Sequence, residues 1–166
     1  MADILHRTRV ACRVAGDAWA VAEHHRIREE VFVREQRLFQ GSDRDGRDDE
    51  AATIKVLGFR DGVPGGAVRL YRLDAAGRWQ GDRLAVLFGS RGHGLGAPLV
   101  RFAVATAASG GGRLMTAHIQ PRNVAFFERL GWSMSGEREI YVGVPHVPMS
   151  IDLTGMDARG GSARAR

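Results

Sequence analysis

The stretch that decides the fold reads RLAVLFGSRGHGLG and runs from Arg83 to Gly96. Its first six residues are mostly apolar and predict a strand, and residues 97–108 after it predict a helix. The alternating glycines leave backbone N–H groups uncovered at the N-terminus of that helix. Unpaired N–H groups and the helix dipole both favour an anion there. The stretch therefore predicts a cradle for a phosphate or a pyrophosphate.

Two common nucleotide-binding motifs do not fit this stretch. A Walker loop needs a Lys-Ser/Thr pair after its last glycine, where this chain has Ala97-Pro98. A Rossmann fingerprint has the spacing GxGxxG in the first βα unit and an acidic residue about 20 residues later. Here the spacing is GxGxG in the middle of the chain, and the first acidic residue after it is Glu128. Both nucleotide interpretations are weakened by these differences.

The composition favours a globular protein in a reducing compartment. The net charge is +5, but three arginines of the C-terminal tail contribute much of it, which argues against a nucleic-acid binder. No apolar run approaches the roughly 20 residues of a membrane span. The chain has one cysteine, Cys12, so an internal disulfide is excluded. We therefore expect a cytoplasmic protein with neither a nucleic-acid nor a membrane partner.

Hydrophobic periodicity and turn residues predict strands and helices in alternation along the chain. The expected strands cover residues 8–15, 51–60, 67–73, 83–88, 113–119, 132–142 and 144–153. The expected helices run from the N-cap Asp17 to about residue 35, from the glycine loop to about residue 108, and from Pro121 to Gly131. Residues 36–50 predict a polar loop or a broken short helix, and turns are expected at 61–66 and 75–80.

The glycine stretch resembles the acyl-coenzyme A loop of the GNAT N-acetyltransferases, whose pattern is Q/R-x-x-G-x-G/A. The predicted order of elements is also the GNAT order. The resemblance implies an α+β fold with a mixed, mostly antiparallel sheet flanked by helices. It also implies that the strands at 83–88 and 113–119 splay apart and admit the pantetheine of the cofactor as a pseudo-strand. This GNAT domain should span residues 1–155, before a disordered basic tail at 156–166.

Two further motifs are similar to the ElaA-like branch of the GNAT superfamily. The first is REEVFVREQ from Arg28 to Gln36, followed by Asp43, Asp45 and Asp48 and then by Arg69-Leu70. The second is the ending, with GE at 136–137 and GVPHVPM at 143–149. The acyl-homoserine-lactone synthases, which share the GNAT fold, also have Arg, Phe, Asp, Asp and Arg in the order of Arg28, Phe32, Asp45, Asp48 and Arg69. These matches do not identify a substrate.

The acidic residues between 43 and 48 allow several interpretations. They could hold a cationic amine with its orienting arginines, bind a cation, form a solvated loop, or build an ion network with Arg28 and Arg69. An EF-hand is excluded, since the glycine comes two places early and Ile54 stands where the bidentate glutamate should be. We therefore predict no metal site. In the enzyme interpretation, an acid among Glu35, Asp43 and Asp45 accepts the amine proton, directly or through water.

The resemblance leaves the general acid open. Phe126 to Trp132 reads FFERLGW, and many GNAT relatives have tyrosine where this chain has Phe127. That tyrosine protonates the departing thiolate, whereas a phenylalanine ring has no proton to give. Several side chains could substitute for it or be structural: His93, His118, Tyr141 and His146. In the same motif, Gln120 rather than Asn123 has the spacing of the amide at the pantetheine.

The expected site has three parts. Catalytic residues are sought among Glu35, Asp43, Asp45, His118 and Tyr141. The cofactor is expected at Leu84, Ala85, Val86, Arg91, Gly92, His93, Gly94, Leu95, Gly96, Ala97, Gln120 and Phe127, with backbone N–H groups near 85–87 holding the carbonyl. The acceptor is expected at Arg28, Phe32, Asp48, Arg69 and His146.

These features predict an N-acyltransferase, most simply an N-acetyltransferase that moves an acetyl group from acetyl-coenzyme A to an amine of a small molecule. A homodimer is a further expectation. Two alternatives stay open. The match of Arg28, Phe32 and Arg69 favours an acyl-homoserine-lactone-synthase-like enzyme that uses S-adenosylmethionine. Phe127 favours a non-catalytic sensor that binds acyl-coenzyme A.

Overall fold

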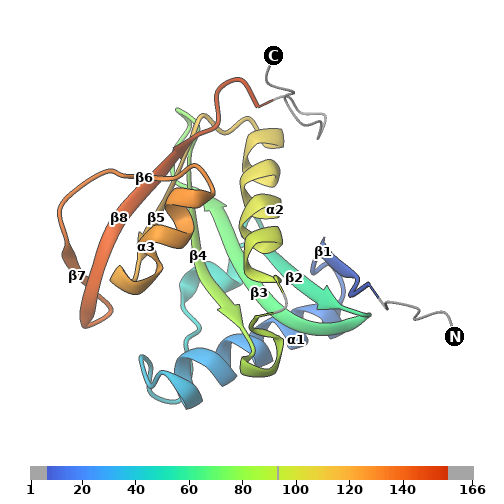
Figure 1. The fold of residues 1–166 in the computed structure, drawn as a ribbon. Coiled ribbons are helices and arrows are strands. Elements are labelled where there is room, and N and C mark those ends of the chain that lie inside the picture. The colour runs from blue at the N-terminus through green and yellow to red at the C-terminus, as the bar shows by residue number, and fades with distance from the viewer. Residues whose placement is uncertain (1–6, 93, 157–166) are drawn as a thin grey trace, which may run out of the picture.

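A mixed sheet of eight strands forms the centre of the computed structural model, which describes residues 7–92 and 94–156 (Figure 1). Its strands are β1 (Val10–Val14), β2 (Ile54–Arg60), β3 (Val63–Arg72), β4 (Arg78–Val86), β5 (Leu114–Ile119), β6 (Ser133–Met134), β7 (Glu139–Tyr141) and β8 (Val144–Asp152). Their order is β1-β2-β3-β4-β5-β8-β6, and β7 pairs with β8. Neighbouring strands are antiparallel except β4 and β5, which are parallel and so need a crossover connection.

Helices cover both faces of this sheet. They are α1 (Ala18–Arg28), the π-helical segment η1 (Glu29–Glu35), α2 (Gly96–Ser109), α3 (Val124–Arg129) and three 3-10 turns, η2 (Gly46–Asp49), η3 (Phe88–Ser90) and η4 (Pro121–Asn123). Asp17 caps α1 as predicted, because its carboxylate accepts a hydrogen bond from the N–H of Ala20 at 2.8 Å. Within the described part of the chain, no helix is both long and apolar enough to cross a membrane.

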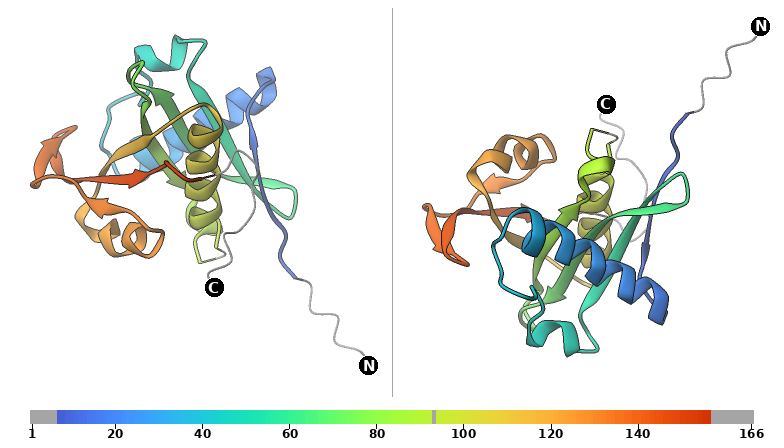
Figure 2. Two further views of the ribbon diagram at one scale, coloured as in Figure 1. Left: turned by 90° about the horizontal axis from the view of Figure 1, so that it is seen from above. Right: turned by 90° about the horizontal axis from the view of Figure 1, so that it is seen from below.

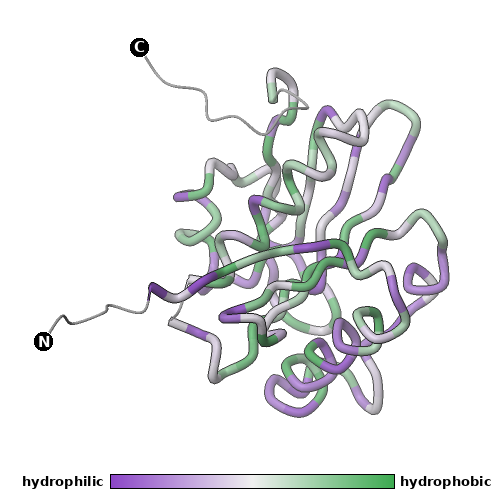
Figure 3. The backbone as a smooth tube through the Cα atoms, turned by 90° about the vertical axis from the view of Figure 1, so that its right-hand side faces the viewer, coloured by the Kyte–Doolittle hydropathy of each residue, from purple (hydrophilic) through white to green (hydrophobic). Residues whose placement is uncertain are grey.

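Two hydrophobic cores lie on opposite faces of the sheet, with α1 on one face and α2 on the other (Figure 2). On the α1 face, Ala20, Ile27 and Val31 pack with the β2, β3 and β4 residues Leu57, Ala67 and Ala85. On the α2 face, the larger core joins α2 and α3 to the opposite side chains of β2–β5 and β8. In Figure 3, hydrophobic residues predominate along α2, whereas hydrophilic residues are interspersed along α1. Each strand therefore sends alternate side chains to two different environments.

The parallel pair β4 and β5 separates after a short contact. Arg78, Trp79 and Gln80 of β4 pair with residues 114–116 of β5, and no pairing follows. Beyond that point β4 continues to Val86 and β5 continues to Ile119, each paired only on its outer side. The sheet is thus mixed, mostly antiparallel, flanked by helices and split between β4 and β5, as the resemblance implied.

Three predicted boundaries are wrong. The turn expected at 75–80 takes only residues 75–77, because the left-handed Gly77 (φ 93°) and the Asp74 carboxylate, which accepts from Arg78 N–H, close it early. Strand β4 therefore starts at Arg78. The turn expected at 61–66 is the two-residue turn Asp61-Gly62, with φ of 50° and 81°, which suits a tight hairpin. The strand expected at 132–142 is split into β6 and β7.

The first helix also differs from its prediction. It is regular only to Arg28 and then widens into η1, where the N–H of Gln36 donates to Val31 O, five residues earlier, at 2.8 Å. Such widened turns change which side chains share a face and are frequent at functional sites. The predicted tail lies outside the described residues apart from Met156, and His93 lies outside them as well.

The turn between β7 and β8 holds a strained residue. Val142 has φ 46°, a left-handed conformation that is unfavourable for a β-branched side chain, and Gly143 follows with φ 78°. Asn tolerates this conformation and Asn-Gly is the preferred sequence for such a turn. Val142→Asn should therefore raise the free energy of unfolding by about 1 kcal/mol, measured by urea denaturation. Ile140→Asn, on the exposed side of β7, is the control and should give no gain; an equal effect of both substitutions would contradict the assignment of strain.

Candidate active site

A cavity of about 130 Å³ lies where β4 and β5 separate. Gly81–Leu84 of β4, Ala117–Ile119 of β5 and Gln120 after β5 line it, directly beyond the last paired residues of the two strands. The predicted site residues Phe32, Leu84, His118, Gln120, Phe127, Tyr141 and His146 also line it. The structure therefore brings together side chains from η1, β4, β5, α3, β7 and β8 that the sequence could only propose separately.

A second groove adjoins this cavity and leads to the glycine loop. Its outer end is lined by Arg91, Gly96 and Arg122, and it shares Gln36, Leu84, Asn123 and Phe127 with the cavity. Helix α2 begins at Gly96 without a side-chain hydrogen bond to its N-terminus, in contrast to α1. The first N–H groups of α2 thus lack a side-chain cap at the end of a groove that carries two arginines, which suits an anionic ligand.

The glycines before α2 leave the backbone around them open, as the alternating pattern predicts. Gly92 and Gly94 are left-handed (φ 78° and 71°), and no atom lies within 4 Å of the place where either would carry a Cβ. Two details differ from the predicted cradle. The Arg91 guanidinium donates to the Val86 carbonyl at 3.0 Å and pairs with Glu35, so its side chain lies across the groove. The N–H of Leu87 donates to Gly65 O at 2.9 Å and is not available to a ligand carbonyl.

Aromatic and charged side chains form one polar wall of the cavity. His118 lies on β5, and its Nδ1 hydrogen-bonds to the carboxylate of Glu139 on β7. Tyr141 stacks on His118 with ring centroids 4.2 Å apart, and His146 meets Tyr141 edge-on at 5.3 Å. A carboxylate can only accept, so this bond places the proton of a neutral His118 on Nδ1 and leaves Nε2 with a lone pair.

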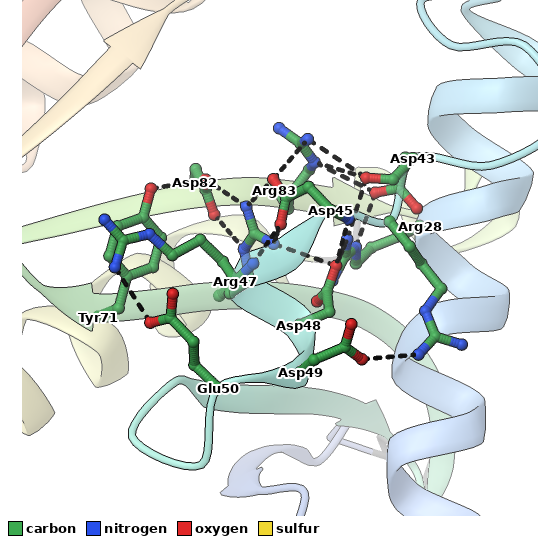
Figure 4. A network of polar contacts seen from close by, with 12 residues as sticks. Arg28, Asp43, Asp45, Arg47, Asp48, Asp49, Glu50, Tyr71, Asp82 and Arg83 are labelled. Atoms are coloured by element: carbon green, nitrogen blue, oxygen red, sulfur yellow. Dashed lines mark hydrogen bonds and ion pairs between the residues drawn. The ribbon is translucent and has the colours of Figure 1, made fainter.

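A network of charged side chains adjoins the cavity on its β4 side, where Asp82 and Arg83 line it (Figure 4). Arg28 and Arg69 are fully buried, and each donates to two aspartates. Arg28 contacts Asp43 at 2.7 Å and Asp48 at 2.6 Å. Arg69 contacts Asp45 at 2.6 Å and Asp82 at 2.7 Å.

Arg83 joins this network to the cavity, because it lines the cavity and lies 3.3 Å from Asp43 and 3.4 Å from Asp45. Hydrogen bonds from Arg69 hold the pKa of Asp45 below its ordinary value. Burial acts to raise the pKa of Asp48, but hydrogen bonds from Arg28 outweigh it and lower that pKa. Both carboxylates are therefore held in their charged form.

The predicted acids of the 43–48 loop do not reach the cavity. Asp43 and Asp48 are buried against arginines, and Asp45 and Asp48 cap η2 reciprocally through the backbone N–H groups of Arg47 and Asp45. The structure thus favours the ion-network interpretation, and it gives Arg28, Asp48 and Arg69 supporting positions outside the cavity. Glu35 lines the outer groove beside Arg91 instead of the cavity.

Four charged residues of this region were not proposed from the sequence. Asp82 and Arg83 line the cavity, Glu139 pairs with His118, and Arg122 lines the groove. Asp82 was overlooked because β4 was expected to start after it. Arg83 has φ 52° at a break in the β3–β4 register, a feature without a residue signature. Glu139 is brought to His118 by the pairing of β7 with β8, and Arg122 directly follows Pro121 at the start of η4.

Comparison with known proteins assigns the family. Residues 50–153 match the profile of the acetyltransferase (GNAT) domain, which is more than half of this 166-residue chain. The chain belongs to the GNAT acetyltransferase family. It is 32% identical over 128 residues to YjcF of Bacillus subtilis, an uncharacterised N-acetyltransferase, covering 76% of this chain and 88% of that protein.

Solved structures show the same fold for this GNAT chain. Escherichia coli ElaA superposes with a TM-score of 0.75 at 19% identity, covering 88% of this chain and 100% of that one. BjaI, a coenzyme A-dependent acyl-homoserine lactone synthase solved with S-adenosylmethionine and isopentyl-CoA, superposes with a TM-score of 0.72 at 16% identity, covering 90% and 85%. The predicted GNAT fold and acyltransferase class are thus confirmed, including the likeness to ElaA and to the lactone synthases.

The residues present fit the acyl-coenzyme A that GNAT acyltransferases use as co-substrate. The uncapped start of α2 and Arg122 suit the anionic end of this molecule. The apolar side chains of Leu84 and Phe127 suit its slender end, which carries the acyl group. Among residues 7–92 and 94–156, no three or more His, Cys, Asp or Glu side chains are grouped to hold a metal ion.

The network predicts an acid-sensitive fold through His24. This fully buried ring donates from Nδ1 to Val56 O at 3.0 Å and accepts from Arg28 at Nε2 at 3.3 Å, so only its neutral form fits. Burial, with the nearby Arg28 charge, lowers the pKa of His24 to about 3. Because this pKa lies below the unfolded value, the folded protein binds fewer protons, and stability falls as the pH drops from about 6.5 toward 3.

We expect His24 to reduce the free energy of unfolding by about 1 kcal/mol between pH 6 and pH 5. Urea denaturation at both pH values measures this change. The Gln side chain of the His24→Gln variant does not titrate. Between pH 6 and pH 5 this variant should therefore lose about 1 kcal/mol less free energy of unfolding than the parent, although it is less stable than the parent at pH 7. His25, whose pKa is lowered to about 4 by burial, remains in both proteins and gives a common background. Equal losses in the parent and the variant would contradict the role of His24.

Proposed function

We propose that this chain transfers an acyl group from coenzyme A to the amine of a small molecule. The observation that carries the proposal is the continuity of cavity and groove. Leu84, Asn123 and Phe127 belong to both, so a ligand anchored at the start of α2 can reach the gap between β4 and β5. The polar wall at His118 then lies where an acceptor amine would meet the acyl carbon.

The groove offers distinct partners to the two ends of acyl-coenzyme A. Residues 91–97, the first N–H groups of α2 and Arg122 would hold its phosphates. Gln120 and Asn123 both line the cavity beside the gap, and either amide could pair with the pantetheine. Gln120 already donates to Gln36 at 3.1 Å across the mouth, so Asn123 joins it as a candidate.

The reaction exchanges one bond for another at the acyl carbon. The amine nitrogen attacks the thioester carbonyl carbon, a C–N bond forms and the C–S bond breaks. The nitrogen gives up one proton, and the sulfur leaves as a thiolate that takes a proton afterwards. Phe127 cannot supply that proton, but a thiol with a pKa near 8.5 is a fair leaving group near neutral pH. Water can therefore protonate it after departure.

His118 is placed to accept the amine proton. Its Nδ1 is held by Glu139 and its Nε2 is left with a lone pair at the cavity wall. The side chain is 28% exposed, so it is in contact with the cavity without being freely solvated. We assign the base role to His118, with Tyr141 holding the ring by stacking, in place of the acids first expected at 35–45.

A second candidate is an acyl-homoserine-lactone-synthase-like reaction with S-adenosylmethionine as the amine. The favouring observation is that Arg28, Asp45, Asp48 and Arg69, which follow the order of that group, meet in one network linked to the cavity by Arg83. In either case the cytoplasmic location and the homodimeric state stay predictions.

The function is tested by an amine panel that includes S-adenosylmethionine. The protein is incubated with acetyl- and longer acyl-coenzyme A, free thiol is measured, and products are identified by mass spectrometry. Amine-dependent thiol release and an N-acyl product are expected. Binding of acyl-coenzyme A without release for any amine would overturn the enzyme proposal in favour of the sensor.

The phosphate end of the groove is tested at Gly96. This residue has no left-handed backbone, and a Cβ there would meet only Phe126, at 3.4 Å. Gly96→Glu adds a negative charge at the start of α2, whereas Gly96→Gln adds the same bulk without charge. Calorimetry should show coenzyme A binding at least about tenfold weaker for Glu than for Gln, or about 1.4 kcal/mol. If both variants bind coenzyme A with equal affinity, the start of α2 is not part of the binding site.

The base is tested with His118→Gln and Glu139→Gln. His118→Gln should lower kcat about a hundredfold or more with little change in the KM for acyl-coenzyme A. Glu139→Gln should lower kcat less, because an amide can accept from or donate to Nδ1 and no longer fixes the tautomer. Imidazole ¹⁵N shifts of His118 report that loss directly. Glu137→Gln, an exposed neighbour, is the matched control. A His118→Gln variant within about threefold of the parent kcat would exclude His118 as the base.

A further inference from the structure

The two faces of the sheet give the cavity two different halves. The half on the α1 side, which we call the polar half, carries charged side chains beside Phe32, Leu38 and Phe39, whereas the half on the α2 side is apolar. On β4 and β5, Asp82, Arg83 and His118 interact with polar partners toward the α1 side. The side chains of Leu84, Met115 and Ala117 belong to the core on the α2 side. All six residues line the same cavity. Because strands alternate their side chains, the gap between β4 and β5 is a passage from one environment to the other.

The apolar half of the cavity reaches into the core on the α2 side. Past Leu84 and Phe127, it continues to core residues that are each at most 4% exposed yet line the cavity: Val68, Val100, Ala103, Met115 and Trp132. Protein interiors are normally packed without such space. Gly81 also lines the cavity, and a Cβ at this position would lie 2.7 Å from Met115 Cε.

The chemistry of the apolar half suits a hydrocarbon chain. The five core residues that line it carry one polar atom, Trp132 Nε1, which has no hydrogen-bond partner among the described residues. Water is poorly held in an apolar space because it needs two to four polar partners. An acetyl group would add one methyl beyond the carbonyl and leave this space unfilled, whereas a longer chain would occupy it.

We propose that the preferred acyl donor carries a short to medium chain instead of acetyl, and that the chain lies against Val100, Ala103 and Met115. This inference rests on the proposed function. An apolar cavity of about 150 Å³ holds a benzene ring, which has six carbons. The cavity here measures about 130 Å³ with its polar half included, so its apolar half takes a chain of about four, and at most about six, carbons. The acceptor amine would approach from the polar half, beside His118.

The inference is tested with acetyl-, butyryl-, hexanoyl- and octanoyl-coenzyme A. Calorimetry without amine and thiol release with the best amine are measured for each donor. Butyryl- or hexanoyl-coenzyme A should bind, and react in kcat/KM, at least about tenfold better than acetyl-coenzyme A. Octanoyl-coenzyme A should fall below the optimum. A parent protein that prefers acetyl-coenzyme A would overturn the inference.

Variants on α2 locate the chain. Ala103→Phe fills the apolar end and should reduce hexanoyl transfer at least about tenfold while acetyl transfer changes less than about threefold. Ala105→Phe makes the same change on the exposed side of α2 and is the matched control. Val100→Ala enlarges the space and should move the optimum to longer chains, so the proposal does not depend on Ala103→Phe folding. The proposal would be overturned if Ala103→Phe reduced hexanoyl and acetyl transfer equally and Val100→Ala left the preferred chain length unchanged.

The outcomes separate this inference from the function on which it rests. If no amine gives thiol release, the proposed reaction fails, but a preference for hexanoyl-coenzyme A in calorimetry still supports the acyl site. If thiol release occurs but every chain length binds and reacts alike, the reaction stands and the acyl site is refuted.

Discussion

The site depends on one constraint in the sheet: β4 and β5 share only three residue pairs before they separate. Each strand keeps its outer partner, β3 or β8, so the inner edges diverge without either strand unfolding. Backbone groups along a strand edge remain competent to bind an extended ligand. The same divergence leaves a gap in the sheet that connects its two faces. The gap therefore has charged side chains at its end on the α1 side and apolar side chains at its end on the α2 side. Both the proposed acceptor side and the proposed acyl side follow from this short pairing.

The β4 side of the cavity adjoins buried ion pairs. Arg28 at the end of α1 and Arg69 in β3 are fully buried, so each needs charged partners, and the loop at 43–48 supplies most of them. Asp82 and Arg83 connect this network to the cavity, which gives the acidic loop an influence on the site without direct contact. Removing one member of such a buried pair commonly destabilises a protein by about 3–5 kcal/mol, because the other charge is left unpaired. If a substitution of Arg28 or Asp48 lowers the activity, the cause is therefore as much a loss of stability as a loss of substrate binding.

The fold could be predicted from the sequence because its signals are local. The glycines at 92, 94 and 96 and the cap at Asp17 each act within a few residues, and the structure agrees with them. Residues of the site were found where a motif names them, as with Phe32, Leu84 and Phe127. His118 was one of several catalytic candidates, but no motif assigned it the proposed role of base. The partner of His118 is Glu139, which lies 21 residues later in the chain on the short strand β7, and the acids near residue 45 were already used by buried arginines. Which charged side chains pair with one another in the folded protein cannot be recognised from a short stretch of sequence.

The same network has a consequence for how the chain reaches its fold. Arg69 and Asp82 are cross-strand partners next to the irregularity in β3–β4 pairing. A slip of one residue would turn Arg69 to the opposite face and into the apolar core around Val68 and Leu70. The free energy of an unpaired buried guanidinium would make that arrangement far less stable than the native one. These charges therefore select one alignment of the hairpin among its competitors, and with it the position at which β4 starts to diverge from β5.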